Sequence, residues 1–459
     1  MNPQLSIEPF SGLLPSEQQQ IRAVAEEFRA LFGRKPHFVV LAPGRVNLIG
    51  EHTDYNGYPV LPAAIDRAML VATAPRRDDV VVARSTAPGT EPVTFSLAQP
   101  LRPNPEGHWG NYIKAAALPW LARSEHVAAG ADLLVKGHVP AGAGLSSSSA
   151  LVVGAGLAFL AAHGATDANL LTLAEEFAEA ERFVGTMSGG MDQTCCLFGK
   201  REQLLRIEFF PVRVRPVPFP TGYHIVVCHS LVKAEKSAGA REAYNQRVRE
   251  CAVAARCLAL LLGETEPRRF TRLAEIERTA RALRRWELLD LLVQRIPDRP
   301  VTPNDLAALL GATVDDLVAD IPGLTPDLPL LVLRRARHVF SEADRVDIAE
   351  RALWNADIGT LHAAMKASHE SCRDDYEVSC PALEVLVRVA TEAGAIGARL
   401  TGAGFGGCTV QLVPSGALAE FFQRVDREFY APRLPSGDAP MRWRFAFLPD
   451  NGARVVRVE

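Results

Sequence analysis

A run of small residues at 140–149 carries the most explicit chemistry in the sequence. It reads Pro-Ala-Gly-Ala-Gly-Leu-Ser-Ser-Ser-Ser and lies between an expected strand at 132–139 and an apolar segment at 150–162 that predicts a buried helix. Small residues let several backbone N–H groups converge, and the following helix adds the positive end of its dipole. The pattern indicates a phosphate-binding loop rather than a flexible linker, although it lacks the Gly-Lys-Ser/Thr end of a Walker A loop.

A second glycine-rich turn carries a carboxylate that could act as a base. Residues 189–193 read Gly-Gly-Met-Asp-Gln. A carboxylate in such a turn can approach a substrate hydroxyl closely and accept its proton as the oxygen attacks phosphorus. Asp192 is therefore the candidate base, although an aspartate beside glycines is often only part of an Asx turn.

A third stretch crowds charged side chains around two glycines. Residues 42–55 read Ala-Pro-Gly-Arg-Val-Asn-Leu-Ile-Gly-Glu-His-Thr-Asp-Tyr. Two acids and one histidine could hold a metal, but Glu-His-x-Asp on a loop is not a usual zinc pattern. The stretch is better interpreted as part of a ligand site.

Together these stretches resemble the motifs of a known family. Residues 42–55 are similar to the opening motif of the galactokinases. Residues 140–150 resemble the phosphate loop of the superfamily that joins galactokinases, homoserine kinases, mevalonate kinases and phosphomevalonate kinases. Residues 400–408, Leu-Thr-Gly-Ala-Gly-Phe-Gly-Gly-Cys, resemble the third motif of that superfamily. The motifs follow the family order, and the similarity covers roughly residues 16–455.

The resemblance implies an ATP-dependent sugar 1-kinase that converts galactose to galactose 1-phosphate. In the family pattern Asp192 is the general base that takes the proton of the anomeric hydroxyl. Arg45 would lie against it, where its charge keeps the carboxylate ionised and stabilises the anionic oxygen as it forms. A purely structural ion pair is the alternative for Arg45.

For the sugar, the resemblance implies a set of residues that hold its hydroxyl groups and line its pocket. The set consists of Arg45, Glu51, His52, Asp54, Gly189, Asp192 and Tyr244. Carboxylates suit this task because each sugar hydroxyl can donate to them. Tyr244 is the weakest member, since a tyrosine at this helical spacing is as often a half-buried core residue.

For ATP, the resemblance implies Trp109 near the adenine and a loop around the phosphates. The loop residues are Gly142, Ala143, Gly144, Leu145, Ser146, Ser147, Ser148 and Ser149. Mg²⁺ would be bound by Ser148, or an adjacent serine, together with Glu181, because it prefers hard oxygen ligands. Simple core packing is the alternative for Trp109.

The expected fold is α+β, a two-domain arrangement like that of the GHMP kinases, with the active site in the cleft between the domains. A length of 459 residues is more than one hydrophobic core usually serves. We expect an N-terminal domain at 1–205 and a C-terminal domain at 206–459. The charged, proline-interrupted stretch at about 264–328 predicts inserted helices in the second domain.

Hydrophobic spacing and turn residues predict the individual elements. Helices are expected at 16–32, 170–183 and 240–262, and strands at 37–41, 60–65, 68–72, 80–84 and 223–229. Ser16 would cap the first helix and Gly33 would end it. Pro62 assigns its strand to a sheet edge at best, and the prolines of 211–220 indicate a connector.

Composition narrows the choice of partners. Lys+Arg number 50 against 53 Asp+Glu, and the net charge of -3 leaves no basic footprint for nucleic acid or an anionic membrane. The first residues lack the features of a signal peptide, and no apolar segment is long enough to span a bilayer. We expect a cytoplasmic monomer with small-molecule partners, the sugar and ATP. The eight scattered cysteines predict free thiols without disulfides.

Two alternatives stay open. The inserted helices and residues 185–192 resemble N-acetylgalactosamine kinases more than short galactokinases, whereas Tyr244 favours galactose, because we expect phenylalanine there in the other branch. The alternative of another class is a non-catalytic regulator that binds galactose and ATP. Such regulators lose small residues after Gly-Leu-Ser-Ser, whereas this chain keeps residues 146–150 and Asp192 intact.

Overall fold

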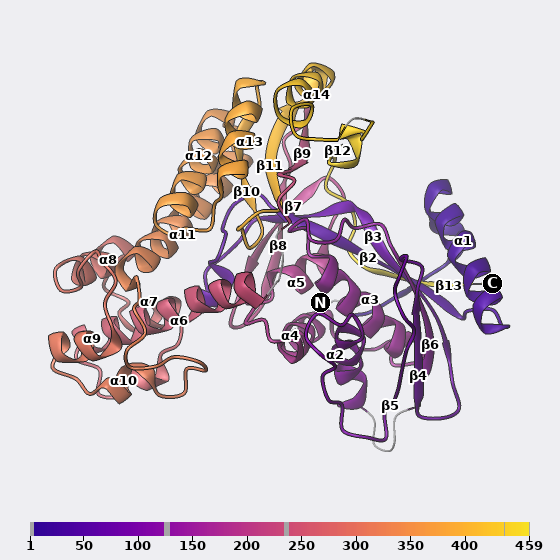
Figure 1. Ribbon diagram of the computed structural model, residues 1–459, viewed down its shortest axis with the longest axis horizontal. Coiled ribbons are helices and arrows are strands. Elements are labelled where there is room, and N and C mark those ends of the chain that lie inside the picture. Colours follow the sequence, from indigo (N-terminus) through magenta and orange to yellow (C-terminus); the bar gives the residue numbers. More distant parts are fainter. Residues whose placement is uncertain (1–3, 124–128, 234–237, 436, 459) are drawn as a thin grey trace.

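Two β-sheets organise the chain, each covered by helices (Figure 1). The computed structural model describes residues 4–123, 129–233, 238–435 and 437–458. The first sheet has seven strands in the order β1-β13-β2-β3-β6-β4-β5. In that order its strands are Ile7–Glu8, Arg454–Arg457, Phe38–Asn47, Pro62–Pro75, Ala131–Gly137, Val80–Ser85 and Val93–Ser96.

Helices cover both faces of the first sheet, because its inner strands carry consecutive apolar residues, such as residues 38–42 of β2 and 68–72 of β3. Along β2, Val39 and Leu41 pack against α1 (Pro15–Phe32), whereas Val40 and Ala42 belong to the core shared with helices on the other face. Those helices are α2 (Gly110–Leu121), α3 (Ser147–Ala162), α4 (Leu170–Glu181) and α5 (Met191–Phe198). The apolar helix expected after the phosphate loop is α3, which lies in the middle of this layer.

The second sheet is smaller and antiparallel, in the order β10-β11-β9-β12. Its strands are Ile396–Thr401, Cys408–Pro414, Tyr223–His229 and Arg444–Phe447. One face packs against α11 (Val332–Trp354) and α12 (Ile358–Asp374), and the other against α13 (Pro381–Glu392) and α14 (Leu418–Val425). The core on the α11 and α12 side also includes Val46 and Leu48 of the first half, so it joins the two halves of the molecule.

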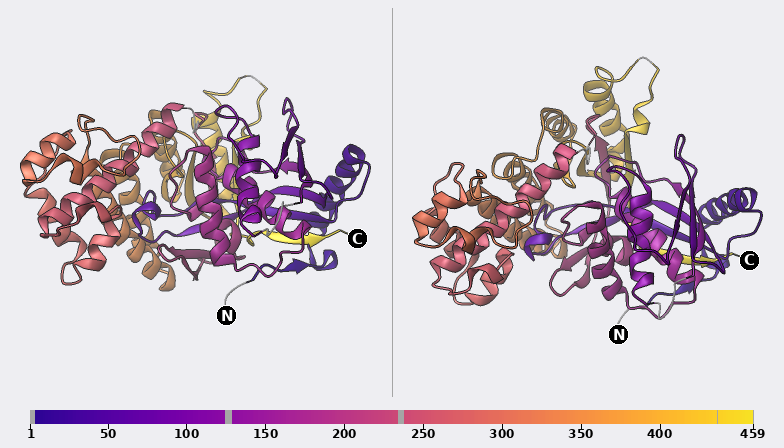
Figure 2. Two further views of the ribbon diagram at one scale, coloured as in Figure 1. Left: turned by 90° about the horizontal axis from the view of Figure 1, so that it is seen from below. Right: turned by 60° about the horizontal axis from the view of Figure 1, so that its bottom comes forward.

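The stretch expected to hold inserted helices forms a compact group at one end of the molecule. It follows the long α6 (Ala238–Leu261), and its helices are α7 (Leu273–Thr279), α8 (Arg285–Val293), α9 (Pro303–Leu310) and α10 (Val314–Val318). Figures 1 and 2 place this group at the opposite end of the molecule from α1. The buried Arg256 of α6 ties the group down, because its guanidinium donates to four backbone carbonyls, those of Arg268, Phe270, Leu317 and Ala319.

The two ends of the chain meet in the first sheet. Its last strand, β13, pairs antiparallel with β2 and parallel with β1, so the C-terminus returns to the first sheet. The expected boundary after residue 205 falls within β7 (Gln203–Glu208). The division into 1–205 and 206–459 therefore stays a prediction.

Several expected elements differ in detail. One strand, β3, replaces the two expected at 60–65 and 68–72, and it lies inside the sheet between β2 and β6. The prediction of an edge strand was wrong because Pro62 is the first residue of β3, a position that proline tolerates. The first helix begins at Pro15 without a cap from Ser16, and Glu17 accepts the N–H of Leu14 instead. It ends at Gly33 as predicted, with φ of 70°.

Two further boundaries were wrong. The helix expected from residue 150 begins at Ser147, so three of the serines assigned to the loop form its first turn. The proline-rich segment at 211–220 contains β8 (Arg213–Pro218), which pairs with β7 as a two-stranded hairpin, because its prolines lie at a sheet edge. Among the described residues no helix could cross a membrane, and all eight cysteines are free thiols.

Candidate active site

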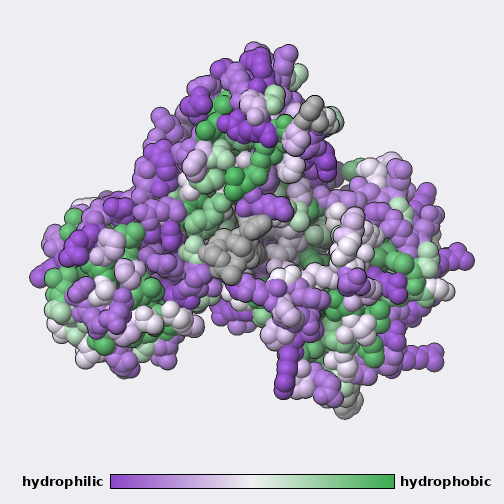
Figure 3. Space-filling view, in the orientation of Figure 1, coloured by the Kyte–Doolittle hydropathy of each residue, from purple (hydrophilic) through white to green (hydrophobic). Residues whose placement is uncertain are grey.

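A cavity of about 770 Å³ opens where three motifs meet. These are the first motif at residues 42–55, the phosphate loop at 140–149 and the third motif at 400–408. The surface is visibly hollowed between the upper part of the molecule and the part at the right in Figure 3. Most of the predicted site residues line the cavity: Arg45, Glu51, His52, Asp54, Trp109, Gly142, Gly144, Leu145, Ser146, Ser147, Ser148, Glu181, Asp192 and Tyr244. The predicted residues Ala143, Ser149 and Gly189 lie behind this lining.

The motifs interlock through backbone contacts that only glycine allows. A Cβ on Gly44 would lie 2.6 Å from the carbonyl oxygen of Leu145, which joins the first motif to the phosphate loop. A Cβ on Gly402 would lie 2.7 Å from the carbonyl oxygen of Gly144, which joins the third motif to the same loop. These distances are shorter than any real Cβ contact, so the glycines are required for the close approach. Both neighbouring motifs therefore set the position of the phosphate loop.

The phosphate loop ends in a helix N-terminus that faces the cavity. Gly142, Gly144 and Ser146 have φ values of 68°, 75° and 58°, and α3 begins at the next residue. The N–H groups of the first turn have no carbonyl partner within the helix and point toward an incoming anion. A non-glycine residue with left-handed φ, such as Ser146, is a strained conformation that is often found at functional sites. The geometry is that of a phosphate site.

Arg45 and Asp192 form a close ion pair beside this loop. The Nε and Nη2 atoms of Arg45 lie 2.7 and 2.6 Å from Oδ1 of Asp192, and Nη1 donates to the carbonyl of Gly144 at 2.7 Å. Burial lowers the pKa of Arg45, but the carboxylates of Asp192 and Glu51 outweigh it and raise that pKa. The hydroxyl of Ser146 donates to the other oxygen, Oδ2. A carboxylate and a fixed positive charge thus lie next to the phosphate loop.

Asp54 and Tyr244 lie on the same part of the cavity wall as Asp192. Burial, with the nearby charge of Asp192, raises the pKa of Asp54 to about 6. Gly189 packs against it so closely that a Cβ would lie 2.6 Å from Cγ of Asp54. The ring of Tyr244 lies 5.4 Å from that of His52. The structure brings these predicted residues together, although Gly189 packs behind Asp54 and is not part of the cavity lining.

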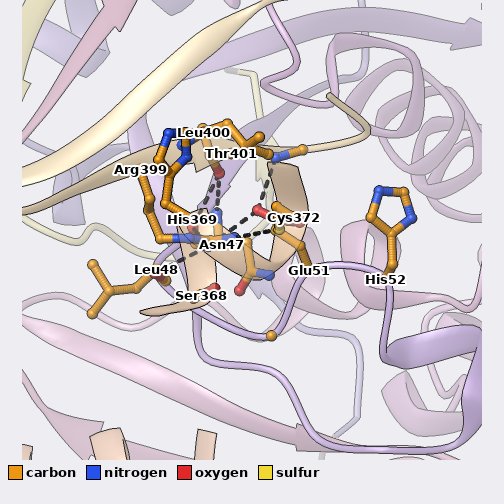
Figure 4. A network of polar contacts seen from close by, with 12 residues as sticks. Asn47, Leu48, Glu51, His52, Ser368, His369, Cys372, Arg399, Leu400 and Thr401 are labelled. Atoms are coloured by element: carbon orange, nitrogen blue, oxygen red, sulfur yellow. Dashed lines mark hydrogen bonds and ion pairs between the residues drawn. The ribbon is translucent and has the colours of Figure 1, made fainter. Parts of the chain in front are cut away.

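Glu51 and His52 already have protein partners, and Figure 4 shows those of Glu51. Oε1 of Glu51 accepts the N–H of Gly402 at 2.9 Å and lies 3.4 Å from Nη1 of Arg399. Nε2 of His52 lies 3.3 Å from the carbonyl of Ala403, which can only accept, so Nε2 carries the proton. Burial lowers the pKa of His52 well below its usual value, so the ring is neutral. Both side chains thus bind residues 42–55 to the third motif at residues 400–408. The sequence did not reveal this role.

A hydroxyl and a carboxylate lie together where the resemblance places Mg²⁺. Ser148 lies in the first turn of α3 and lines the cavity, and Glu181 is the last residue of α4. The Glu181 carboxylate accepts from Ser149 Oγ at 2.8 Å and from the side-chain amide of Gln193. Hydroxyl and carboxylate oxygens are the ligands that Mg²⁺ prefers, so the donor set fits this ion.

The wall beyond the phosphate loop includes residues that sequence reasoning missed. Trp109 lies on this wall, and its indole N–H donates to the carbonyl of Glu91 at 2.9 Å. The residues missed on the cavity wall include Ser85, Thr86, Ala87, Pro88, Thr90, Tyr112, Arg241 and Phe405. Phe405 lies within residues 400–408, whereas the others belong to no glycine-rich motif and reach the cavity only through the fold. The aromatic pair Trp109 and Tyr112 offers flat apolar surface suited to a base.

Fold and site together define a GHMP kinase. Residues 111–200 match the family described as GHMP kinases N terminal domain, and residues 349–431 match GHMP kinases C terminal. A mevalonate kinase structure shares the fold with a TM-score of 0.54 at 15% identity, covering 90% of this chain and 99% of that one.

Closer similarities identify the family within this class. Residues 26–75 match the galactokinase galactose-binding signature. The galactokinase of Roseiflexus sp. (strain RS-1) is 38% identical over 86% of this chain and 88% of its own length. That of Dictyostelium discoideum is 33% identical over 96% and 95%. The structure of Lactococcus lactis galactokinase complexed with galactose superposes with a TM-score of 0.72 at 26% identity, covering 96% of this chain and all of that one. The chain belongs to the galactokinase family.

Proposed function

We propose that the protein transfers the γ-phosphoryl group of ATP to the anomeric hydroxyl of galactose, which gives galactose 1-phosphate and ADP. The single observation that carries this proposal is the Arg45–Asp192 pair, which lies beside the phosphate loop in the wall of the same cavity. The match of residues 26–75 to a galactose-binding signature supports the choice of sugar.

Asp192 accepts the proton of the anomeric hydroxyl as its oxygen attacks the γ-phosphorus. One carboxylate oxygen is engaged by Arg45 and the other accepts from Ser146, so the group is oriented before the sugar binds. Arg45 keeps the carboxylate ionised and stabilises the negative charge that develops on the sugar oxygen. The ring oxygen makes the anomeric hydroxyl the most acidic one of the sugar, so a modest base suffices. Positioning then supplies much of the rate.

The sugar lies against Asp54, Tyr244 and the signature stretch. The ionised carboxylate of Asp54 accepts hydrogen bonds from the sugar hydroxyls, and the Tyr244 ring supplies a flat apolar face. Oε1 of Glu51 and Nε2 of His52 are already bonded to Gly402 and Ala403. The remaining polar atoms of these two side chains contribute to binding the sugar. Gly189 lets the backbone approach closely behind Asp54.

ATP binds with its phosphates on residues 142–149 and its base near Trp109. The N–H groups at the start of α3 hold the phosphates. Mg²⁺ would be bound by Ser148 and Glu181, where it would neutralise charge on the phosphates.

Two alternatives are phosphorylation of N-acetylgalactosamine and a non-catalytic regulator role. The assay of ADP release described below distinguishes both from galactose phosphorylation. The regulator alternative requires a site without turnover, whereas here the base, its arginine and the phosphate loop are all in place. Monomeric state and cytoplasmic location stay predictions from the sequence.

ADP release tests the proposal directly. The purified protein is assayed with Mg-ATP and galactose, N-acetylgalactosamine or no sugar, and Asp192→Ala serves as the control. We expect turnover with galactose that is lost in the variant. Preference for the acetylated sugar would change the substrate, and sugar binding without turnover would support the regulator.

A further inference from the structure

The signature loop, residues 47–55, is held from outside the cavity by the C-terminal half of the chain. Oε1 of Glu342, on α11, accepts the backbone N–H of Gly50 at 2.8 Å and that of Glu51 at 3.3 Å. One turn earlier on the same helix, Nε2 of His338 lies 3.0 Å from the carbonyl oxygen of Glu51. One helix thus binds both the N–H groups and a carbonyl group of this turn.

The Glu342 carboxylate is fully buried and fully engaged. Besides the loop, it accepts from Ser368 Oγ at 2.6 Å and from Arg345 Nε at 2.7 Å. Burial raises its pKa, but the charges of Arg345 and Arg399 prevail and bring that pKa to about 2. The group is therefore ionised at any pH at which the enzyme can be assayed, and hydrogen bonds to a charged acceptor are strong.

The loop is also fixed at its start. Nη1 of the buried Arg399 donates to the carbonyl oxygen of Leu48 at 3.2 Å and lies 3.4 Å from that of Asn47 (Figure 4). Gly50 has φ of 103°, and a Cβ there would lie 2.9 Å from the side chain of Val346 on α11. The backbone of the loop therefore packs directly against side chains of this helix.

We infer that Glu342 and His338 are positioning residues for the sugar. They act through the backbone of Gly50 and Glu51, and the next residues, His52 and Asp54, line the cavity. His52 has a left-handed φ of 62°, a conformation that persists only where its surroundings impose it. This inference rests on the proposed function, because it takes the signature loop as the galactose site.

The expected effect is selective. The phosphate loop takes its position from Gly44 and Gly402, and neither Glu342 nor His338 lines the cavity. A change at Glu342 should therefore weaken galactose binding and leave ATP binding nearly unchanged. A role limited to global stability would lower both affinities together or neither.

Glu342→Gln tests the inference with little change in shape. Whichever way the new amide is turned, its NH₂ group faces a donor, either the N–H of Gly50 or Nε of Arg345. We expect the KM for galactose to rise about tenfold or more, since small misplacements of binding groups are costly. The KM for ATP should stay within about twofold. Calorimetric titration with galactose should show the same loss of affinity.

Glu350→Gln is the matched control. Glu350 is a buried glutamate two turns further along α11, and its carboxylate accepts from Arg206 at 2.8 Å and from Arg215 at 2.9 Å. This variant also breaks buried charged hydrogen bonds, but far from the signature loop. Both KM values should remain within about twofold of wild type even where the melting temperature falls.

A milder pair of variants covers the case in which Glu342→Gln does not fold. His338→Leu removes the donor to Glu51, whereas His338→Gln retains an N–H that can reach that carbonyl. The leucine variant should raise the KM for galactose about fivefold, and the glutamine variant should recover most of it. If the wild type is active and galactose affinity is unchanged in His338→Leu, and in Glu342→Gln where that variant folds, the inference alone is overturned. A wild type that neither binds nor phosphorylates galactose overturns the proposed function and this inference together.

Discussion

The phosphate loop and the signature loop both line the cavity, but they are built in opposite ways. The phosphate loop takes its chemistry from its own backbone, through left-handed glycines and the first turn of α3. The signature loop is buried, and it is held by Glu342 and Arg399, which lie 292 and 351 positions along the chain from the backbone groups that they bind. The binding groups of the phosphate loop are therefore specified within one segment, which Gly44 and Gly402 only position, whereas the signature loop takes its shape from helices of the other half of the molecule.

The two sites should be sensitive to substitutions in different parts of the chain. A local site is damaged by changes within its own loop or at its immediate contacts. A site assembled from distant residues is damaged by changes in the helices behind it, and substrate affinity records that damage selectively.

The largest effect is expected at the point where the two sites meet. Asp192→Asn keeps the size of the side chain but removes its ability to accept the proton. Because general base catalysis contributes about 10²–10⁴-fold, kcat should fall by that amount while galactose still binds. Steady-state kinetics and calorimetry measure the two separately, and a kcat within about fivefold of wild type would exclude Asp192 as the base.

A change at Gly402 should disturb the phosphate loop. A Cβ there would collide with the carbonyl of Gly144, so Gly402→Ala should raise the KM for ATP about tenfold by displacing that loop. Gly394→Ala is the matched control, because Gly394 also has left-handed φ, 91° against 85°, but its Cβ would meet nothing within 4 Å. It should lose about 1 kcal/mol of stability and keep its KM for ATP. Equal KM values in the two variants would refute the contact.

Galactose affinity should depend on pH through Asp54. Burial, with the charge of Asp192, raises the pKa of Asp54 to about 6, so the carboxyl takes up a proton as the pH falls through that value. The protonated carboxyl accepts fewer hydrogen bonds from the sugar hydroxyls. The KM for galactose should therefore rise about tenfold per pH unit below 6. His52 adds nothing in this range, because burial keeps its pKa well below the usual value. A profile of kcat/KM for wild type and Asp54→Asn checks this, and the variant should be flat there.

The smallest effect on catalysis is expected in the inserted helices. Arg256→Met leaves four buried carbonyls without their donor, which should cost about 3 kcal/mol of unfolding free energy. Because these carbonyls lie outside the cavity, both KM values should stay within about threefold at temperatures where the variant is folded. Thermal unfolding monitored alongside kinetics measures both, and a selective loss of galactose affinity would show that the inserted helices position the sugar.

The same contrast explains how much the sequence revealed. The phosphate loop and Asp192 were recognised because small residues and one carboxylate are close together in the chain. Glu342 and His338 could not be found, because on a helix they look like ordinary charged residues and only the packing of α11 brings them to Gly50. The α+β fold was predicted correctly. Pro62 led to the wrong prediction of an edge strand, because proline is tolerated at the first position of an interior strand.

Phosphoryl transfer to the anomeric oxygen leaves a direct signature in the structure of the product. Galactose, Mg-ATP and the purified protein are incubated, and the product is examined by proton and phosphorus NMR. We predict one new phosphate ester whose phosphorus couples to the anomeric proton, absent when Asp192→Ala replaces the wild type. A phosphate on any other carbon, or no sugar phosphate at all, would contradict the account.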